Sequence, residues 1–163
     1  MLKKIIFFSV VFSFHFNVNA QENVPNVTLK TILGNSIQSS EIINDEGFSI
    51  ISFWATWCIP CVNELDAIND VYDSWNENFS IKVVAISTDD ARSKKRVRPM
   101  VSGKNWGFDV YSDYNQEFKR SLNVSGIPHT IVAYGSKIIH RRIGYSPGEE
   151  VDLFKIISNY KQK

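Results

Sequence analysis

A run of apolar and small residues, Phe48 to Phe53, leads into the segment that contains both cysteines of the chain, Cys58 and Cys61. A short apolar run of this kind predicts a buried strand. Beyond Cys61, large apolar residues recur at steps of three and four, the spacing of one buried helix face. These residues are Leu65, Ile68, Tyr72, Trp75 and Phe79. Pro60 fits the first turn of such a helix, where no backbone N–H is needed. The sequence therefore predicts a strand, a turn and a helix, with both thiols at the start of the helix.

The N-terminus has the pattern of a secretory signal. Lys3 and Lys4 precede an apolar stretch from Ile5 to about Phe16, and small or apolar residues follow up to Ala20. This order is typical of a signal peptide that is cleaved, here after Ala20. The apolar stretch is shorter than the roughly 20 residues that cross a bilayer, so we expect no stable membrane anchor. The alternative is a signal that is retained as an anchor.

Removal of residues 1–20 leaves 21–163, a length that favours a single domain with an adequate core. The chain carries 18 Lys and Arg against 17 Asp and Glu. Such a balance gives no reason to expect nucleic acid as a partner. We expect the mature protein to be exported to the periplasm.

The cysteine pair admits three interpretations. As a structural disulfide it closes only four residues, which gives roughly 2 kcal/mol against about 4.7 for a loop of 100 residues. As a copper or zinc site it is incomplete, because only His129 and His140 remain after the signal and no second pair of cysteines exists. A binding module or metal chaperone remains the alternative function, and stoichiometric metal on the reduced protein without insulin reduction would identify it.

Redox activity explains more of the surrounding sequence. The free N–H groups and the dipole at a helix N-terminus stabilise a thiolate, which favours Cys58 as the attacking sulfur. Cys61, one turn into the helix, is then the resolving thiol, and we expect Cys58 to be exposed and Cys61 buried. No cofactor is required beyond the Cys58–Cys61 disulfide itself.

Strand and helix patterns alternate along the rest of the chain. Strands are predicted over Ile81–Ser87, Phe108–Tyr111, Thr130–Tyr134 and Lys137–Ile143, and helices over Asp90 to about Val101, Asn115–Leu122 and from Ser146 onward. The last helix has a capping box at Ser146 and Glu149, with Val151, Phe154, Ile157 and Tyr160 as its apolar face. The last two strands form a hairpin that turns at Gly135.

Two motifs, Trp57-Cys58-Ile59-Pro60-Cys61 and Gly126-Ile127-Pro128-His129-Thr130, resemble those of the thioredoxin superfamily. Within it the chain is similar to exported TlpA-like thiol-disulfide oxidoreductases, which are related to the thioredoxins of cytochrome c maturation. The resemblance implies an α/β thioredoxin fold, a central mixed sheet flanked by helices, with an added N-terminal hairpin over Val24–Ile37. It implies an enzyme that exchanges disulfides with protein substrates as a reductant, supplied with electrons by a membrane partner. A peroxide-reducing relative is disfavoured, because its reactive cysteine usually lacks a partner three residues on.

The resemblance also assigns roles to single residues. The redox pair falls on Cys58 and Cys61, and the cis-proline on Pro128. The backbone of Ile127 is expected to pair with an extended substrate peptide. Glu64 is expected to shuttle protons for the buried cysteine, with a solvated helix glutamate as the alternative.

Other residues near the motifs are less sharply defined. Trp57 is expected at the rim of the site and Trp54 in the core. Ser52 stands where thioredoxin has a buried aspartate, and Asp66 stands where many relatives have a helix-kinking proline, which puts the kink in doubt. His129 either tunes the active-site sulfur or is a hydrogen-bonded strand histidine.

The densest positive run of the chain lies between residues 92 and 98. It comprises Arg92, Lys94, Lys95, Arg96 and Arg98. The first interpretation is the solvated face of a helix, and the alternative is a docking patch for an acidic partner.

Overall fold

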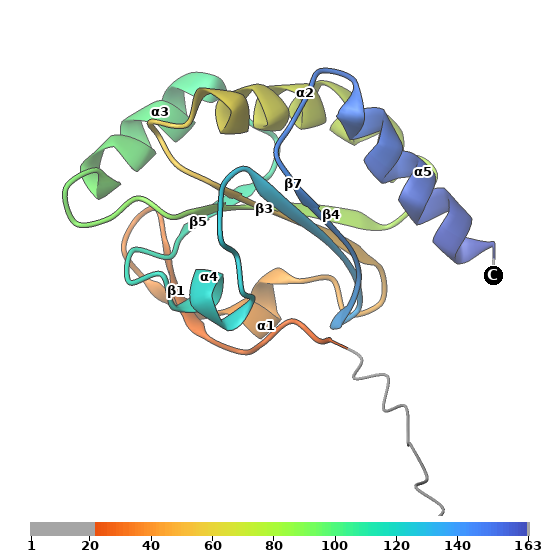
Figure 1. Cartoon of the computed structure of the whole chain (residues 1–163), viewed down its shortest axis with the longest axis horizontal. Helices are drawn as coiled ribbons and strands as arrows, with labels where there is room; N and C mark the ends of the chain where they lie inside the picture. The colour runs from red at the N-terminus through yellow and green to blue at the C-terminus, as the bar shows by residue number, and fades with distance from the viewer. Residues whose placement is uncertain (1–21, 163) are drawn as a thin grey trace, which may run out of the picture.

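The computed structural model describes residues 22–162, which form a seven-stranded mixed sheet covered by helices on both faces (Figure 1). The elements in chain order are β1 Thr28–Thr31, β2 Ser36–Gln38, α1 Ser39–Ile42, β3 Phe48–Trp54, α2 Ile59–Asn76, β4 Ile81–Ser87, η1 Lys94–Arg96, α3 Val97–Lys104, β5 Asp109–Ser112, α4 Glu117–Ser121, β6 His129–Tyr134, β7 Lys137–Ile143 and α5 Glu149–Lys161. The expected signal peptide and its cleavage after Ala20 lie outside the described residues.

The strands follow the order β2-β1-β5-β4-β3-β6-β7. β3 is parallel to β4 and antiparallel to β6, so the sheet is mixed as predicted. β1 and β2 pair with each other in antiparallel register around a turn at Gly34, whose φ of 94° suits glycine, and β1 then joins the main sheet through β5. In residues 22–162 no helix has the length and apolar character needed to cross a membrane.

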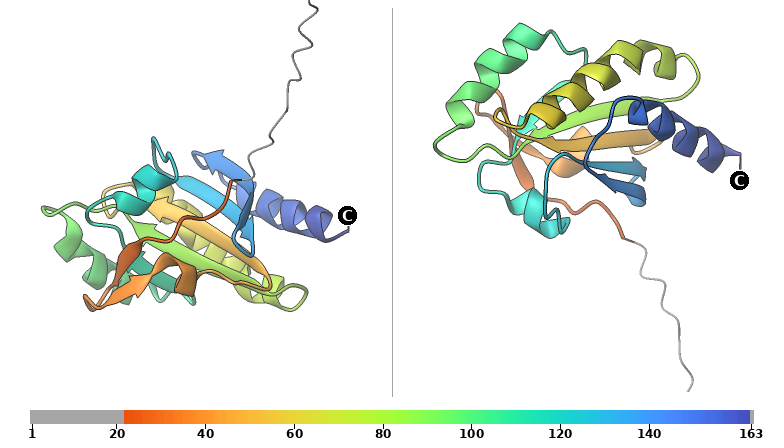
Figure 2. Two further views of the ribbon diagram at one scale, coloured as in Figure 1. Left: turned by 90° about the horizontal axis from the view of Figure 1, so that it is seen from below. Right: turned by 45° about the horizontal axis from the view of Figure 1, so that its top comes forward.

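Two hydrophobic cores lie on the two faces of the sheet. α2, α3 and α5 cover one face, and α1 and α4 cover the other (Figures 1 and 2). Side chains of β3 alternate between them: Ile50 and Trp54 belong to the α2 side, and Ile51 and Phe53 to the opposite side. This alternation determines which polar residues of the strand face α2.

The predicted helix over Asp90 to Val101 is wrong at its start. Asp90 caps only a local turn through the N–H groups of Arg92 and Ser93, and the α-helix α3 begins at Val97. Pro99 supplies the physical reason, because a proline is tolerated in a first turn but breaks the hydrogen bonding of a helix interior. The positive run is therefore divided between the turn at Arg92, η1 and, for Arg98, the first turn of α3, instead of lying on one regular helix face.

The last helix differs from its prediction in a similar way. α5 begins at Glu149, and Glu149 accepts a hydrogen bond from the Ser146 N–H at 2.7 Å, one half of the predicted capping box. Its buried residues are Leu153 and Ile157, whereas Val151 is 48% exposed. The buried face is thus rotated relative to the predicted one.

Candidate active site

Both cysteines lie at the N-terminus of α2, where the sequence places them. α2 begins at Ile59 with Cys58 as its N-cap residue, and the Cys58 carbonyl accepts a hydrogen bond from the Val62 N–H at 3.1 Å. Pro60 occupies the first turn. Cys58 and Cys61 are joined by a disulfide with a Sγ–Sγ distance of 2.03 Å. Both cysteines therefore lie within the first turn of α2.

The two cysteines differ in exposure, although less than predicted. Cys61 has no exposed surface, and Cys58 is 6% exposed, so the expectation of a freely exposed Cys58 is wrong in degree. The reason is that both side chains belong to the hydrophobic core on the α2 face. Trp57 and Ile59 beside Cys58 are 62% and 74% exposed and form an apolar rim. Cys58 is therefore the more exposed of the two cysteines.

Glu64, one helical turn after Cys61, is fully buried. Its carboxylate accepts hydrogen bonds from the hydroxyl groups of Ser52 at 3.0 Å and Thr130 at 2.7 Å. The Arg142 guanidinium forms an ion pair with it at 3.0 Å. The solvated-glutamate alternative is therefore wrong, and Ser52, which replaces an aspartate, contributes a hydroxyl to the same cluster.

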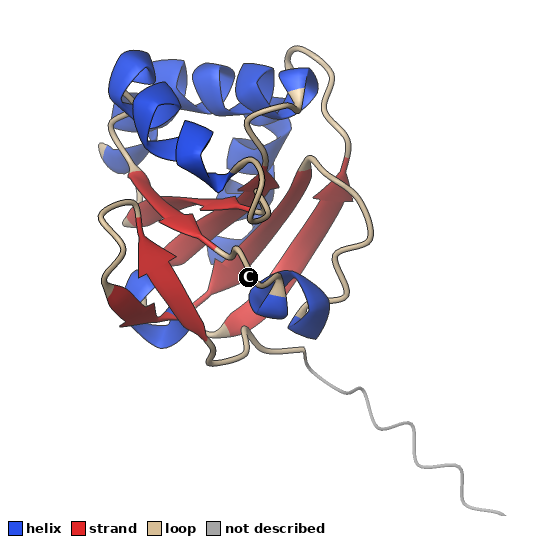
Figure 3. Cartoon of the chain, turned by 90° about the vertical axis from the view of Figure 1, so that its left-hand side faces the viewer, coloured by secondary structure: helices blue, strands red, loops and turns tan. Residues whose placement is uncertain are grey.

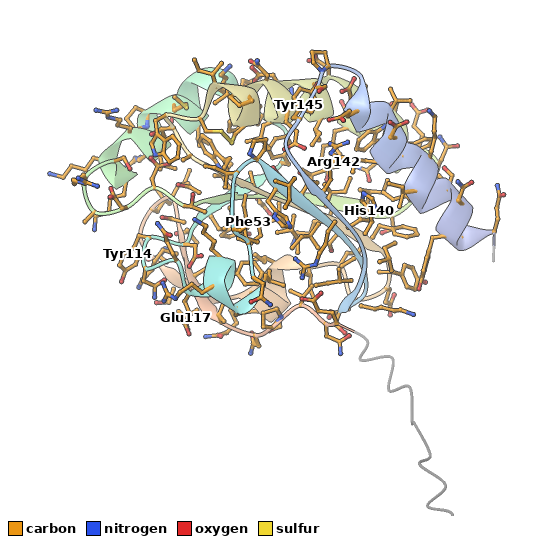
Figure 4. The ribbon with its side chains drawn as sticks, in the orientation of Figure 1. Phe53, Tyr114, Glu117, His140, Arg142 and Tyr145 are labelled. Atoms are coloured by element: carbon orange, nitrogen blue, oxygen red, sulfur yellow. A yellow bond between two sulfur atoms is a disulfide. The ribbon has the colours of Figure 1, made fainter. Side chains whose placement is uncertain are left out.

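Arg142 is the part of this cluster that the sequence analysis missed. It lies on β7 directly opposite Thr130 of β6, near the start of α5 (Figure 4). Besides Glu64 it donates to the Glu149 carbonyl at 2.7 Å, and only 15% of its side chain is exposed. A single guanidinium thus neutralises the buried carboxylate and ties α5 to the strand beside it.

The Ile127–Pro128 peptide bond is cis, and Pro128 is buried. β6 pairs with β3 so that His129 lies opposite Phe53, which places Pro128 next to the β3–α2 connection that carries the cysteines. Within residues 22–162 the backbone N–H and carbonyl of Ile127 have no hydrogen-bond partner. This short backbone edge therefore keeps a free N–H and a free carbonyl within the described part of the chain.

Asp89 fixes the loop in front of the cysteines. It is fully buried, and its carboxylate accepts hydrogen bonds from the Thr56 N–H at 2.9 Å and the Thr56 hydroxyl at 2.6 Å. The Ser87 hydroxyl donates to it at 2.9 Å. Hydrogen bonds to a charged group are stronger than neutral ones, so Asp89 positions the residue that precedes Trp57.

Replacing Asp89 by asparagine is expected to lower the free energy of unfolding by about 2 kcal/mol, because an amide N–H₂ replaces one of the buried acceptor oxygens. Urea unfolding of the oxidised protein measures this loss. Asp90→Asn is the matched control, since 40% of the Asp90 side chain is exposed and its partners Arg92 and Ser93 lie in the same local turn. Equal stability of the two variants would refute the role of Asp89.

Asp66 links α2 to the loop that follows α3. Its carboxylate accepts hydrogen bonds from the Lys104 ammonium at 2.5 Å and the Trp106 indole N–H at 2.8 Å. Trp106 packs edge-on against buried Trp54, with ring centroids 5.2 Å apart. Asp66 therefore holds Trp106 in its place against Trp54, at the end of β3. The helix α2 is continuous from Ile59 to Asn76.

His129 differs from both of its predicted roles. It is 3% exposed, and neither ring nitrogen has a hydrogen-bond partner among the described residues. Side chains alternate along β6, so His129 points to the face opposite Thr130, away from Glu64 and α2. Burial, followed by the nearby Arg141 charge, lowers the pKa of His129 below its usual 6.5.

The lowered pKa of His129 predicts an acid-sensitive fold. Below about pH 6.5 the unfolded chain binds a proton that the folded one resists, so stability falls as pH falls, by at most about 1.4 kcal/mol per pH unit from this group. His129→Leu should remove this component without affecting the curve above pH 7. His140, whose pKa is also lowered by burial and then Arg142, is replaced separately to assign its share. Thermal unfolding between pH 5 and 8 measures the difference, and parallel curves for wild type and H129L would contradict it.

A metal centre requires several ligands close together. Across residues 22–162 no three side chains among His, Cys, Asp and Glu are grouped so as to hold an ion. The cysteines are instead bound to each other.

Comparison with known proteins agrees with this geometry. The model of the AhpC/TSA family matches residues 20–142. This chain belongs to the AhpC/TSA family. A solved thioredoxin-like protein from Porphyromonas gingivalis is 36% identical, with a TM-score of 0.73, and the match covers 83% of this chain and 90% of that one.

Two further relatives of this AhpC/TSA protein have names that describe a function. The thiol-disulfide oxidoreductase ResA of Bacillus thuringiensis strain Al Hakam is 23% identical over 80% of this chain and 73% of its own length. A thiol:disulfide interchange protein of the thioredoxin family from Chlorobium tepidum TLS has a TM-score of 0.67 at 20% identity, and the match covers 85% of this chain and 95% of that one. The predicted thioredoxin fold is confirmed. With its cysteine pair at disulfide distance, the AhpC/TSA protein is a thiol-disulfide oxidoreductase.

Proposed function

We propose that this oxidoreductase works outside the cytoplasm and reduces disulfides of protein substrates through a mixed disulfide on Cys58. The observation that carries the proposal is the order of access at the helix start. Cys58 is the N-cap residue and retains some exposure, whereas Cys61 has none. The helix N-terminus favours the Cys58 thiolate over the thiol.

The reaction begins with the reduced protein. The Cys58 thiolate attacks one sulfur of the substrate disulfide, a mixed disulfide forms, and the other substrate sulfur leaves as a thiolate. Cys61 then loses its proton and attacks the Cys58 sulfur, which releases the second substrate thiolate. Two electrons have passed to the substrate, and the protein holds the Cys58–Cys61 disulfide of the present structure.

Glu64 is proposed to take the proton of Cys61 in the second step. It lies one turn from Cys61 on the same helix and is sealed from water. A buried thiol has no solvent to accept its proton, and a carboxylate positioned on the same helix face supplies an acceptor. Ser52, Thr130 and Arg142 hold that carboxylate in place.

Substrate docking is proposed at the exposed rim and at the free backbone edge. Trp57 offers apolar surface beside Cys58, and the unpaired backbone of Ile127 next to Pro128 can pair with an extended substrate segment. Backbone pairing is independent of substrate sequence, which suits an enzyme that acts on proteins.

The proposed reducing direction is supported by the resemblance to TlpA-like proteins. The signal-like residues 1–20 predict export, where thiols are oxidised, so a reductant there needs electrons from a donor in the membrane. We expect a reduction potential more negative than about −200 mV, on the thioredoxin side of the range of −270 to −120 mV. A glutathione redox titration that returned a value near −120 mV would reverse the proposed direction.

The mechanism is tested by replacing Cys61 with alanine and recovering the molecules that remain covalently bound to Cys58 in the compartment of the protein. Substrate proteins held through a reducible bond are expected, and Cys58→Ala is the control that should hold none. If C61A captures nothing while Cys58 still reacts with a thiol reagent, the mixed-disulfide mechanism is wrong. Sequencing the N-terminus of the mature protein tests cleavage after Ala20.

A further inference from the structure

A positively charged groove of about 510 Å³ lies between β1, the positive run and the segment after β5. Four cationic side chains line it, and among residues 22–162 no acidic residue does. These side chains are Lys30, Lys94, Lys95 and Arg98, and we call the hollow between them the basic groove. Tyr114, which is 44% exposed, forms part of its wall. The groove therefore combines one aromatic side chain with four positively charged ones.

The charge in the basic groove is not neutralised within the described part of the chain. None of its four cations makes an ion pair among residues 22–162. Lys94 lies over the Tyr114 ring at 5.0 Å from the centroid, and Lys30 donates a hydrogen bond to the Ser36 hydroxyl. A hollow lined by one sign of charge attracts ligands of the opposite sign. The ligand of this groove is therefore expected to be anionic.

The basic groove lies at the same end of the strands as the disulfide. Trp54 at the end of β3 is level with Ser87 of β4, Ser87 with Ser112 of β5, and Ser112 with Lys30 of β1. Three steps between strands correspond to about 14 Å. Figure 3 shows the molecule from the left-hand side of Figure 1, with the sheet between the helices above and below it.

A second hollow of about 310 Å³ lies between the two places. It is lined by Trp57, Thr88, Asp90, Arg92, Ser93 and Gln116, and its acidic residue Asp90 is paired with Arg92 at 3.1 Å. Its wall at Arg92 and Ser93 continues directly into Lys94 and Lys95 of the basic groove. The surface therefore runs from the rim of the cysteine pair, across the turn at residues 92–95, into the groove.

We propose that the basic groove binds an acidic segment of the protein substrate while a disulfide of that substrate reacts at Cys58. This inference rests on the proposed function and narrows its substrate class. An extended chain covers about 14 Å in four to five residues. The acidic residues of the substrate therefore lie about four to six residues from its reacting cysteine.

Synthetic peptides test the proposal. Each carries one cysteine as a mixed disulfide with a chromophoric thiol and, five residues away, either three glutamates or three glutamines. The second-order rate of exchange with the reduced full chain is measured at low salt and at 1 M salt. The glutamate peptide is expected to react about 10-fold faster at low salt and to lose this advantage at 1 M salt, because salt screens the attraction.

Charge-reversal variants locate the effect. Lys94→Glu with Lys95→Glu should bring the rate of the glutamate peptide down to that of the glutamine peptide. Lys155→Glu with Lys161→Glu is the matched control, because both lysines are exposed on α5 and the net charge changes equally. Equal rates for the two peptides on the wild-type chain, or equal losses in the two variants, would overturn the proposal.

Binding measured without exchange separates this proposal from the proposed function. A cysteine-free acidic peptide should shift the NMR signals of Lys94 and Tyr114 in the oxidised protein, whether or not any peptide reacts. Exchange of the glutamine peptide without such shifts would refute the groove and leave the oxidoreductase in place. Shifts without exchange of either peptide would refute the mechanism alone. Pyrophosphate that binds the same residues more tightly than the peptide would reassign the groove to small anions and overturn docking.

Discussion

Replacing Arg142 by methionine is expected to lower the free energy of unfolding by about 3–5 kcal/mol. The variant leaves the Glu64 carboxylate fully buried without its counter-charge, and among residues 22–162 its remaining hydrogen-bond partners are the hydroxyl groups of Ser52 and Thr130. It also removes the hydrogen bond to the Glu149 carbonyl at the start of α5. Guanidinium chloride unfolding of the oxidised protein measures the loss.

The neighbouring arginine provides the control. Arg141 lies on the same strand and pairs with Glu22 at the surface, where ion pairs contribute about 0–1 kcal/mol. Glu64→Gln combined with Arg142→Met should recover part of the stability, because neither member of this pair is then left in the core without its partner. Similar losses in R141M and R142M, or no recovery in the double variant, would show that the buried pair is not what stabilises this end of the sheet.

Replacing Glu64 by glutamine is expected to slow the second step of exchange, the attack of Cys61 on the mixed disulfide, by about 100-fold. Glutamine has nearly the same size but cannot accept the Cys61 proton. The first step should be unchanged, because the Cys58 thiolate is stabilised by the helix N-terminus and not by Glu64. Stopped-flow measurement with a chromophoric disulfide separates the formation of the mixed disulfide from its decay.

Glu149→Gln is the matched control for this experiment. Glu149 is the second carboxylate near Arg142, at 4.0 Å, but 38% of its side chain is exposed and it lies on α5 instead of α2. If E64Q slows both steps equally, Glu64 serves the structure of the site and not proton transfer. An unchanged decay rate in E64Q would exclude Glu64 as the proton acceptor.

The features that the sequence predicted well depend on short-range patterns. The strand before the motif, the helix start at Cys58 and the hairpin at Gly135 each follow from residues within a few positions of one another. The separation of buried Trp54 from exposed Trp57 also agrees with the prediction. Hydrophobic periodicity and turn-forming residues act over such distances, so both can be recognised in a single sequence.

The features that were missed depend on contacts between distant positions. Arg142 and Glu64 are 78 residues apart, and Asp89 and Thr56 are 33 apart. A carboxylate on a helix or an arginine on a strand has the same local signature whether it is solvated or buried. Only the pairing of β3 with β6 and of β6 with β7 brings Ser52, Thr130 and Arg142 to one face above the cysteine helix.

The burial of Glu64 opposite Arg142 places a joint constraint on evolutionary change. Loss of either charge alone leaves the other in the core without a counter-charge. The two positions are therefore expected to change together during evolution, or position 64 is expected to become a neutral residue first. Among homologous chains, the residue type at position 142 should therefore correlate with that at position 64 more strongly than with its immediate neighbours on β7. A family alignment would reveal this covariation. It would also separate the members that have a buried acidic residue at position 64 from those that have a neutral one.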